Sequence, residues 1–161
     1  EKSYSDGSQY SRNNPAPVGT AQTFTYSTYS QKYSATATIK EVLRGSAAWA
    51  LIKEANMFNS EPEEGMEYIL AKVAVTLVSS DSDKSVSFGS YSFTLFDTDN
   101  AEYSDIIMGV PPTPAFGGSV YAGGTLEGYV IFMVDKDDIA PKVVIGEDYQ
   151  GIGGAWFGLT K

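Results

Sequence analysis

The stretch EYILAKVAVTLV, residues 67–78, decides the fold class of this 161-residue chain. Every second side chain along it is apolar, and the series runs through Ile69, Ala71, Val73, Val75 and Leu77. A period of two predicts a β-strand with one buried face. The opposite face mixes Lys72 and Thr76 with apolar residues, so we expect this strand to be central in its sheet.

The same alternation recurs on both sides of this stretch. The residues expected to face inward are Tyr33, Ala35, Ala37 and Ile39, then Tyr91, Phe93 and Leu95, then Leu126, Val130, Phe132 and Val134. Shorter candidate strands lie at 142–146 and 155–159, and weaker ones at 22–27 and 85–89. Turn-rich pieces separate these segments, which predicts a mainly β chain folded as an antiparallel β-sandwich. A closed barrel is the alternative.

One short helix, at about residues 46–58, is predicted between two of the strands. On a helical wheel one half of the circumference carries Phe58, Leu51, Ala55, Ala48, Ile52, Asn56 and Trp49. Gly45 lets the chain turn, Ser46 is the expected N-cap, and Pro62 and Gly65 end the element. We expect this amphipathic helix to cover an open end or edge of the sandwich.

Asn56 lies on the apolar side of this helix, between Ile52 and Trp49, and Asn59 follows it. One interpretation is that Asn56 bonds backbone groups of a neighbouring strand or loop, because a buried amide without a partner costs about 1–3 kcal/mol. The other is a recognition group beside an exposed Trp49.

The proline- and glycine-rich segment 109–124 allows two interpretations as well. Phe116 and Tyr121 lie near its middle. The segment is either a cross-over between sheets, with both aromatic side chains packed inward, or a recognition loop presented by a rigid sandwich.

Composition excludes several function classes. The formal net charge is −9 and the pI about 4.4, so the protein repels phosphate backbones and we expect no nucleic-acid binding. Cysteine and histidine are both missing, which excludes disulfides, thiolate and imidazole metal sites, and a histidine base for a serine nucleophile. We expect no cofactor.

The acidic residues leave two alternatives open. Paired carboxylates could support hydrolysis, and the candidates are Glu41, Glu54, Glu67 and Glu127. The loop 97–105 has oxygen ligands suited to calcium, but Ala101, Glu102 and Met108 break the EF-hand pattern. We interpret this loop as a turn and predict no metal site, with adventitious calcium as the alternative.

The first 18 residues are polar and without periodicity, which predicts a flexible tether followed by a single domain at 19–161. No apolar run reaches the roughly 18 residues that a membrane-spanning helix needs.

Four ordered motifs carry a family resemblance: Arg44-Gly45, Ala48-Trp49, Asn56-Met57-Phe58-Asn59 and Glu67-Tyr68-Ile69. With 121–138 and 155–159 they resemble an uncharacterised immunoglobulin-like domain family of Gram-positive cell-surface lipoproteins, whose fold is similar to that of a secreted mycobacterial antigen. The resemblance implies an immunoglobulin-like sandwich, export, and an N-terminal lipid-modified cysteine. This chain has no cysteine, so such an anchor would lie upstream of it.

We therefore predict a non-catalytic, extracellular binding domain of a cell-surface lipoprotein. Its partner would be an unknown protein or cell-envelope component, and it would meet the membrane only through the lipid anchor. The candidate contact residues are Trp49, Asn56, Asn59, Phe116 and Tyr121. The alternatives are an accessory envelope domain without a tight ligand and a carboxylate-dependent hydrolase.

Overall fold

The computed structural model describes residues 10–104 and 109–160 of the chain. Within them lie β1 (Ala21–Ser27), β2 (Lys32–Arg44), α1 (Ser46–Ala55), β3 (Met66–Ser80), β4 (Val86–Gly89), a 3-10 turn η1 (Ser90–Ser92), β5 (Phe93–Phe96), β6 (Gly117–Val120), β7 (Thr125–Asp135), β8 (Lys142–Glu147) and β9 (Gly153–Gly158).

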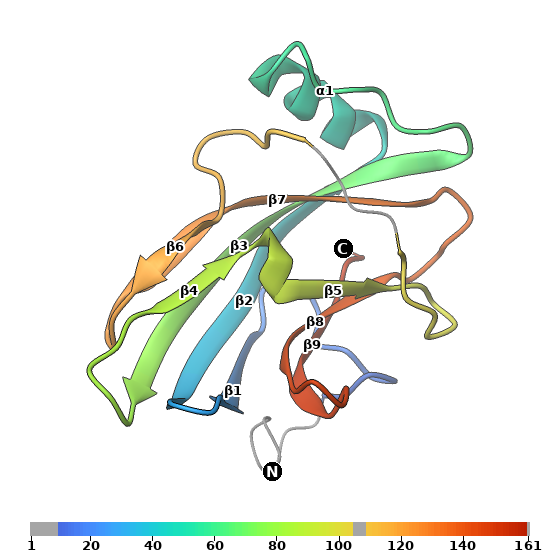
Figure 1. The fold of residues 1–161 in the computed structure, drawn as a ribbon. Coiled ribbons are helices and arrows are strands. Elements are labelled where there is room, and N and C mark those ends of the chain that lie inside the picture. Colours follow the sequence, from blue (N-terminus) through green and yellow to red (C-terminus); the bar gives the residue numbers. More distant parts are fainter. Residues whose placement is uncertain (1–9, 105–108, 161) are drawn as a thin grey trace.

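The described strands form two layers (Figure 1). One layer is a four-stranded antiparallel sheet in the order β1-β2-β3-β7. The other consists of a three-stranded sheet, β5-β8-β9, and a two-stranded sheet, β4-β6. These are separate sheets rather than one closed barrel, so the predicted mainly β sandwich with one inserted helix is confirmed.

The predicted alternation fills the core between the layers. The five inward residues of β3 are all fully buried, as are Ala35 and Ile39 of β2 and Val134 of β7. Tyr91 is an exception with 74% of its surface exposed. Tyr91 does not take part in the alternation of a strand, because residues 90–92 form η1 and β5 begins only at Phe93.

The helix is shorter than predicted. It ends at Ala55, because Asn56 adopts an extended backbone (φ −158°, ψ 118°). Residues 56–58 are therefore not part of the helix, so the helical wheel does not apply to them, and Phe58 is exposed instead of buried. The N-cap is Gly45 rather than Ser46, since φ of +75° there turns the chain from β2 into α1.

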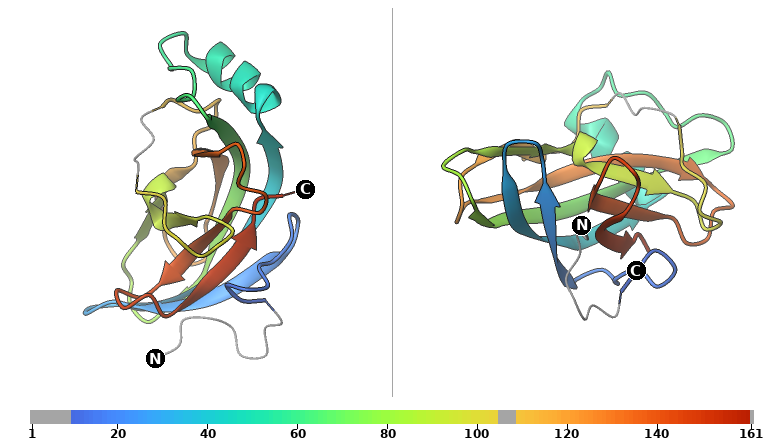
Figure 2. Two further views of the ribbon diagram at one scale, coloured as in Figure 1. Left: turned by 90° about the vertical axis from the view of Figure 1, so that its right-hand side faces the viewer. Right: turned by 60° about the horizontal axis from the view of Figure 1, so that its bottom comes forward.

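Helix α1 lies at one end of the molecule (Figure 1), where it packs on an outer face of the large sheet rather than on the main core between the layers. Its Ala48 and Ile52 pack on a second apolar cluster, formed with Tyr68, Leu70, Ile131 and Met133. Successive side chains of β3 and β7 point to opposite faces, so these residues lie behind the main core. Figure 2 shows α1 on the side of the sheet turned away from β5.

Residues 10–18, part of the predicted tether, lie against β9. Ala16 is fully buried, its N–H donates to the Trp156 carbonyl (2.9 Å) and its carbonyl accepts the Gly158 N–H (2.9 Å). The folded part therefore begins by residue 10 rather than at residue 19, because this short segment pairs with a strand from the other end of the chain. Residues 1–9 of that prediction lie outside the described residues.

Candidate functional site

The residues of the four motifs gather beneath and beside α1. Arg44 Nε donates to Glu67 Oε2 (2.5 Å), and the Gly45 N–H donates to the Tyr68 carbonyl (2.9 Å). A Cβ at Gly45 would lie 3.3 Å from Glu67 Oε1, so the carboxylate packs directly on the glycine. The Arg-Gly and Glu-Tyr motifs thus join the start of the helix to the start of β3.

Trp49 is half-buried and packs on the sheet. Its ring centroid lies 5.8 Å from that of Tyr68, at an interplanar angle of 30°. The Tyr68 hydroxyl donates to the Ser60 carbonyl (2.8 Å), and burial, helped by the negative charge of Glu63, raises the pKa of Tyr68. The Trp49 ring therefore links the helix to Tyr68 of β3.

The two asparagines differ in what they bind. Among residues 10–104 and 109–160, Asn56 Oδ1 accepts the local Phe58 N–H (2.8 Å) and no bond from another strand or loop, so the predicted bond to a neighbouring element is wrong for Asn56. Asn59 makes that kind of bond instead. Its Nδ2 donates to the carbonyls of Ile52 (2.9 Å) and Val110 (2.8 Å), and its Oδ1 accepts the Val110 N–H (2.8 Å).

The two candidates of segment 109–124 lie elsewhere. Phe116 is buried in the main core, 6.0 Å from the Phe93 ring, so it packs inward. Tyr121 is 62% exposed in the turn between β6 and β7. Of the five predicted contact residues, the structure brings together Trp49, Asn56 and Asn59 at α1, and separates the other two from them.

An exposed apolar surface adjoins the three residues at α1. We call it the helix tip, and it consists of Leu51, Met57, Phe58 and Val110. Met57 and Phe58 are 80% and 88% exposed. Val110 lies near them because its N–H donates to Asn59 Oδ1, and Asn59 directly follows Phe58. Four exposed carboxylates lie in the same stretch of chain, at Glu54, Glu61, Glu63 and Glu64. The wheel placed Phe58 and Leu51 on its buried half, so the sequence could not reveal this surface.

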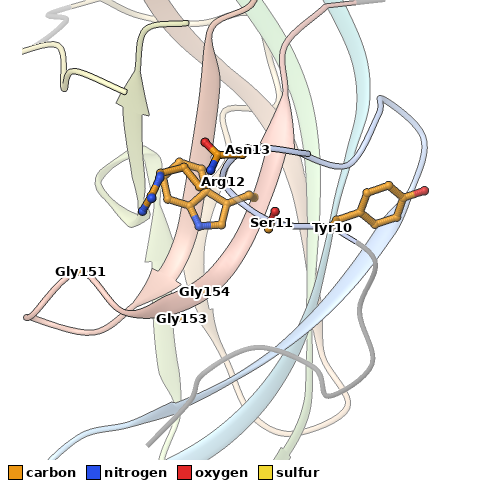
Figure 3. Close-up of a pocket in the computed structure, with 8 residues that line it drawn as sticks. Tyr10, Ser11, Arg12, Asn13, Gly151, Gly153 and Gly154 are labelled. Carbon is orange, nitrogen blue, oxygen red and sulfur yellow. The ribbon is translucent and has the colours of Figure 1, made fainter. Parts of the chain in front are cut away.

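A groove lies at the opposite end of the molecule, between residues 10–13 and the β8–β9 turn. Two adjoining hollows of about 350 and 500 Å³ share Arg12, Gly151 and Trp156, and we call them together the Arg12 groove. Figure 3 shows Arg12 and Asn13 on the same side of their segment, while Tyr10 extends the other way. Sequence reasoning missed this groove, because it assigned Arg12 to a tether and had no signal joining it to β9.

The loop considered for calcium forms a turn at Asp97, and its last acidic residue, Asp105, lies outside the described residues. Asp97 Oδ1 accepts the N–H groups of Asp99 (2.8 Å) and Ala101 (2.9 Å), which is a turn. Buried Asp138 accepts bonds from Thr98 Oγ1 (2.5 Å) and the Tyr103 hydroxyl (2.6 Å). Over residues 10–104 and 109–160, no group of three or more acidic side chains is arranged to hold a metal ion.

Two of the four glutamates proposed for hydrolysis form ion pairs with basic side chains. Glu67 binds Arg44, and Glu127 lies 3.1 Å from Lys40 and 3.6 Å from Lys72. Glu102 and Glu147 do share the Arg12 groove, where burial and the charge of Glu102 raise the pKa of Glu147. Glu102 is exposed and Glu147 is half-buried.

Comparison with known proteins identifies a family model and a shared fold. A model described as a domain of unknown function, DUF4352, matches residues 41–152. No curated protein matches the chain. Among the described residues, no helix has the length and apolar character that a membrane crossing requires.

Two solved structures resemble the chain in fold. The secreted protein MPT63 of Mycobacterium tuberculosis has a TM-score of 0.56 and 15% identity, over 94% of this chain and 99% of its own. A candidate lipoprotein of Bacillus subtilis, YcdA, has a TM-score of 0.53 and 20% identity over 82% of this chain. The match spans only 38% of YcdA. The family resemblance and the immunoglobulin-like fold predicted from the sequence are confirmed.

Proposed function

Because the chain belongs to the DUF4352 family, whose domain has no known function, we propose a role from its own surface: a non-catalytic domain that binds another protein outside the cell. The observation that carries this proposal is the exposure of Met57 and Phe58 beside a rigidly held helix. An exposed apolar cluster with a polar surround is typical of a protein-binding site.

Charge indicates the chemistry of the partner. Residues 51–64, which include most of the helix tip, carry four exposed glutamates and one exposed cation, Lys53. A partner surface with an apolar centre and lysine or arginine at its rim would complement both features. An anionic membrane surface would be repelled by the same carboxylates.

An extracellular location is part of the proposal. The secreted description of MPT63 and the lipoprotein description of YcdA support it, and the chain would then be held at the membrane by a lipid anchor upstream of residue 1. The accessory envelope domain, whose surface binds nothing tightly, is the competing function.

Site-specific photo-crosslinking on intact cells distinguishes the two functions. A benzophenone amino acid at position 58 should give a discrete protein adduct, and one at position 91, equally accessible on the far layer, should not. Excess purified domain should abolish the adduct, whereas domain carrying Met57→Ser and Phe58→Ser should not compete. That double variant should unfold within about 0.5 kcal/mol of wild type, since both side chains are exposed. No adduct from position 58, or equal adducts from both positions, would favour the accessory domain.

A further inference from the structure

The Arg12 groove is independent of the helix tip and has the size of a small-ligand site. Its two hollows, about 350 and 500 Å³, fall within the roughly 300–1,000 Å³ usual for such sites. The β8–β9 turn that forms one wall lies far from α1 (Figure 1). A ligand here would therefore not compete with a protein at the helix tip.

Both walls of the groove are held by backbone hydrogen bonds. Ser11 and Asn14 exchange two bonds (2.9 and 3.0 Å) that close the turn carrying Arg12. Ala16 then fixes this turn to β9.

The opposite wall is a second closed turn. Asp148 Oδ1 accepts the N–H groups of Gln150 (2.8 Å) and Ile152 (2.9 Å), and the Asp148 N–H donates to the Ile152 carbonyl (2.9 Å). A Cβ at Gly154 would lie 2.7 Å from the Glu147 nitrogen, so this wall packs tightly on β8. The groove is thus formed before any ligand arrives, which lowers the entropy cost of binding.

The floor and rim combine flat rings with free polar groups. Trp156 lines both hollows and packs on Phe96, with ring centroids 5.3 Å apart. Tyr149 lies at the rim and is 93% exposed. Within the part of the chain that the structure describes, Arg12 has no hydrogen bond or ion pair, so its guanidinium donors are available.

The charges in the groove oppose each other. Burial and the negative charges of Glu102 and Asp148 raise the pKa of Glu147. The positive charge of Arg12 is close enough to lower that pKa, but its effect is smaller. These three carboxylates against one guanidinium disfavour an anion, and among the described residues no group of three or more acidic side chains is arranged to hold a metal cation. A small zwitterion would gain little, because ion pairs at an exposed site contribute only about 0–1 kcal/mol.

We propose that the Arg12 groove binds a neutral saccharide, with Arg12 donating to ring hydroxyls, Glu147 accepting from them, and Tyr149 covering one face of a sugar ring. Sugar hydroxyls both donate and accept hydrogen bonds, so they can pair with the guanidinium and the carboxylate at once. The apolar C–H face of the ring would contact the exposed Tyr149 side chain. The side-chain amides of Asn13 and Gln150 at the rim offer further donors and acceptors.

Nuclear magnetic resonance titration of the whole chain tests this proposal, with maltotriose and tri-N-acetylchitotriose as probes. At least one probe should give saturable amide shifts confined to residues 11–14 and 148–156. Arg12→Ala and Tyr149→Ala should each weaken binding by about ten-fold, equivalent to about 1.4 kcal/mol. Tyr29→Ala, which removes an equally exposed tyrosine from the β1–β2 turn, should leave binding unchanged.

Three outcomes would overturn the proposal. One is the lack of saturable shifts with either saccharide while the spectrum remains that of the folded protein. Another is unchanged binding in both groove variants. The third is binding of glucuronate or glutamate at the groove without binding of either neutral sugar, which would assign the groove to a charged ligand.

Discussion

Replacing Asn59 by alanine should destabilise the protein through the loss of its three side-chain hydrogen bonds. Each such bond contributes about 1 kcal/mol net, which sets an upper sum of about 3 kcal/mol. The Ile52 carbonyl keeps a second donor, the Asn56 N–H at 3.3 Å, and water can reach the exposed Val110. We therefore expect a loss of about 1–2 kcal/mol in the free energy of unfolding.

Asn56→Ala is the matched control, because it removes the same side chain three residues away. Its single local bond to the Phe58 N–H is exposed, so the loss should be about 0.5 kcal/mol. Equilibrium unfolding in urea, followed by circular dichroism, measures both variants. Hydrogen exchange at the Val110 amide should also quicken in Asn59→Ala and not in Asn56→Ala.

Asn59→Asp sharpens the test. It replaces the donor Nδ2 by an oxygen that faces two carbonyls, so at neutral pH it should be less stable than Asn59→Ala. The difference should shrink below about pH 4, where the protonated acid can donate again. The reasoning fails if Asn59→Ala unfolds like wild type, or if Asn59→Asp is no worse than Asn59→Ala at neutral pH.

Three further predictions concern other parts of the molecule. Deletion of residues 1–18 should lower Tm by about 4 °C or more in calorimetry, because it removes the segment that pairs with β9. An unchanged Tm would instead support the interpretation of residues 1–18 as a flexible tether. Gly146→Ala should lower the free energy of unfolding in urea by more than about 3 kcal/mol, because φ is +85° and the new Cβ would lie 2.2 Å from the Phe24 ring. Gly65→Ala is the control, with φ +82° but no neighbour within 4 Å, and it should cost only about 1–2 kcal/mol. Equal losses in the two variants would contradict the packing argument. Burial and nearby carboxylates raise the pKa of Glu147, so the folded state binds the Glu147 proton more tightly than the unfolded state does. The wild-type protein should therefore lose stability relative to Glu147→Gln as pH rises above the ordinary pKa of 4.5. Parallel plots of unfolding free energy against pH for the two proteins would argue against this.

The strands that form the main core could be predicted because their signal is local. Ile69 to Leu77 alternate without interruption, and the structure buries each predicted inward residue of that strand. The prediction failed at Tyr91, where a short turn before β5 breaks the period.

The helix and its surroundings were harder, because backbone conformation at single residues decides them. An extended Asn56 ended α1 and converted Phe58 from an expected core residue into an exposed one. The sequence marked Asn59 as a polar residue near the helix, but its partner Val110 lies 51 positions away. No local pattern identifies such a partner.

The groove illustrates the same limit more strongly. Arg12 and Trp156 belong to opposite ends of the sequence, and the residues around Arg12 have the composition of a flexible segment. What orders them is the pairing of Ala16 with β9, which is a long-range contact.

The pairing of Ala16 with Phe157 is parallel, and this direction has a mechanical consequence. If the chain is held from its beginning and pulled from its end, the two paired segments are drawn in opposite directions along their own axes. The bonds from Ala16 to Trp156 and Gly158 are then loaded in shear, both at the same moment, rather than opened one after the other. Traction between the two ends of the domain would therefore be resisted by these two bonds together.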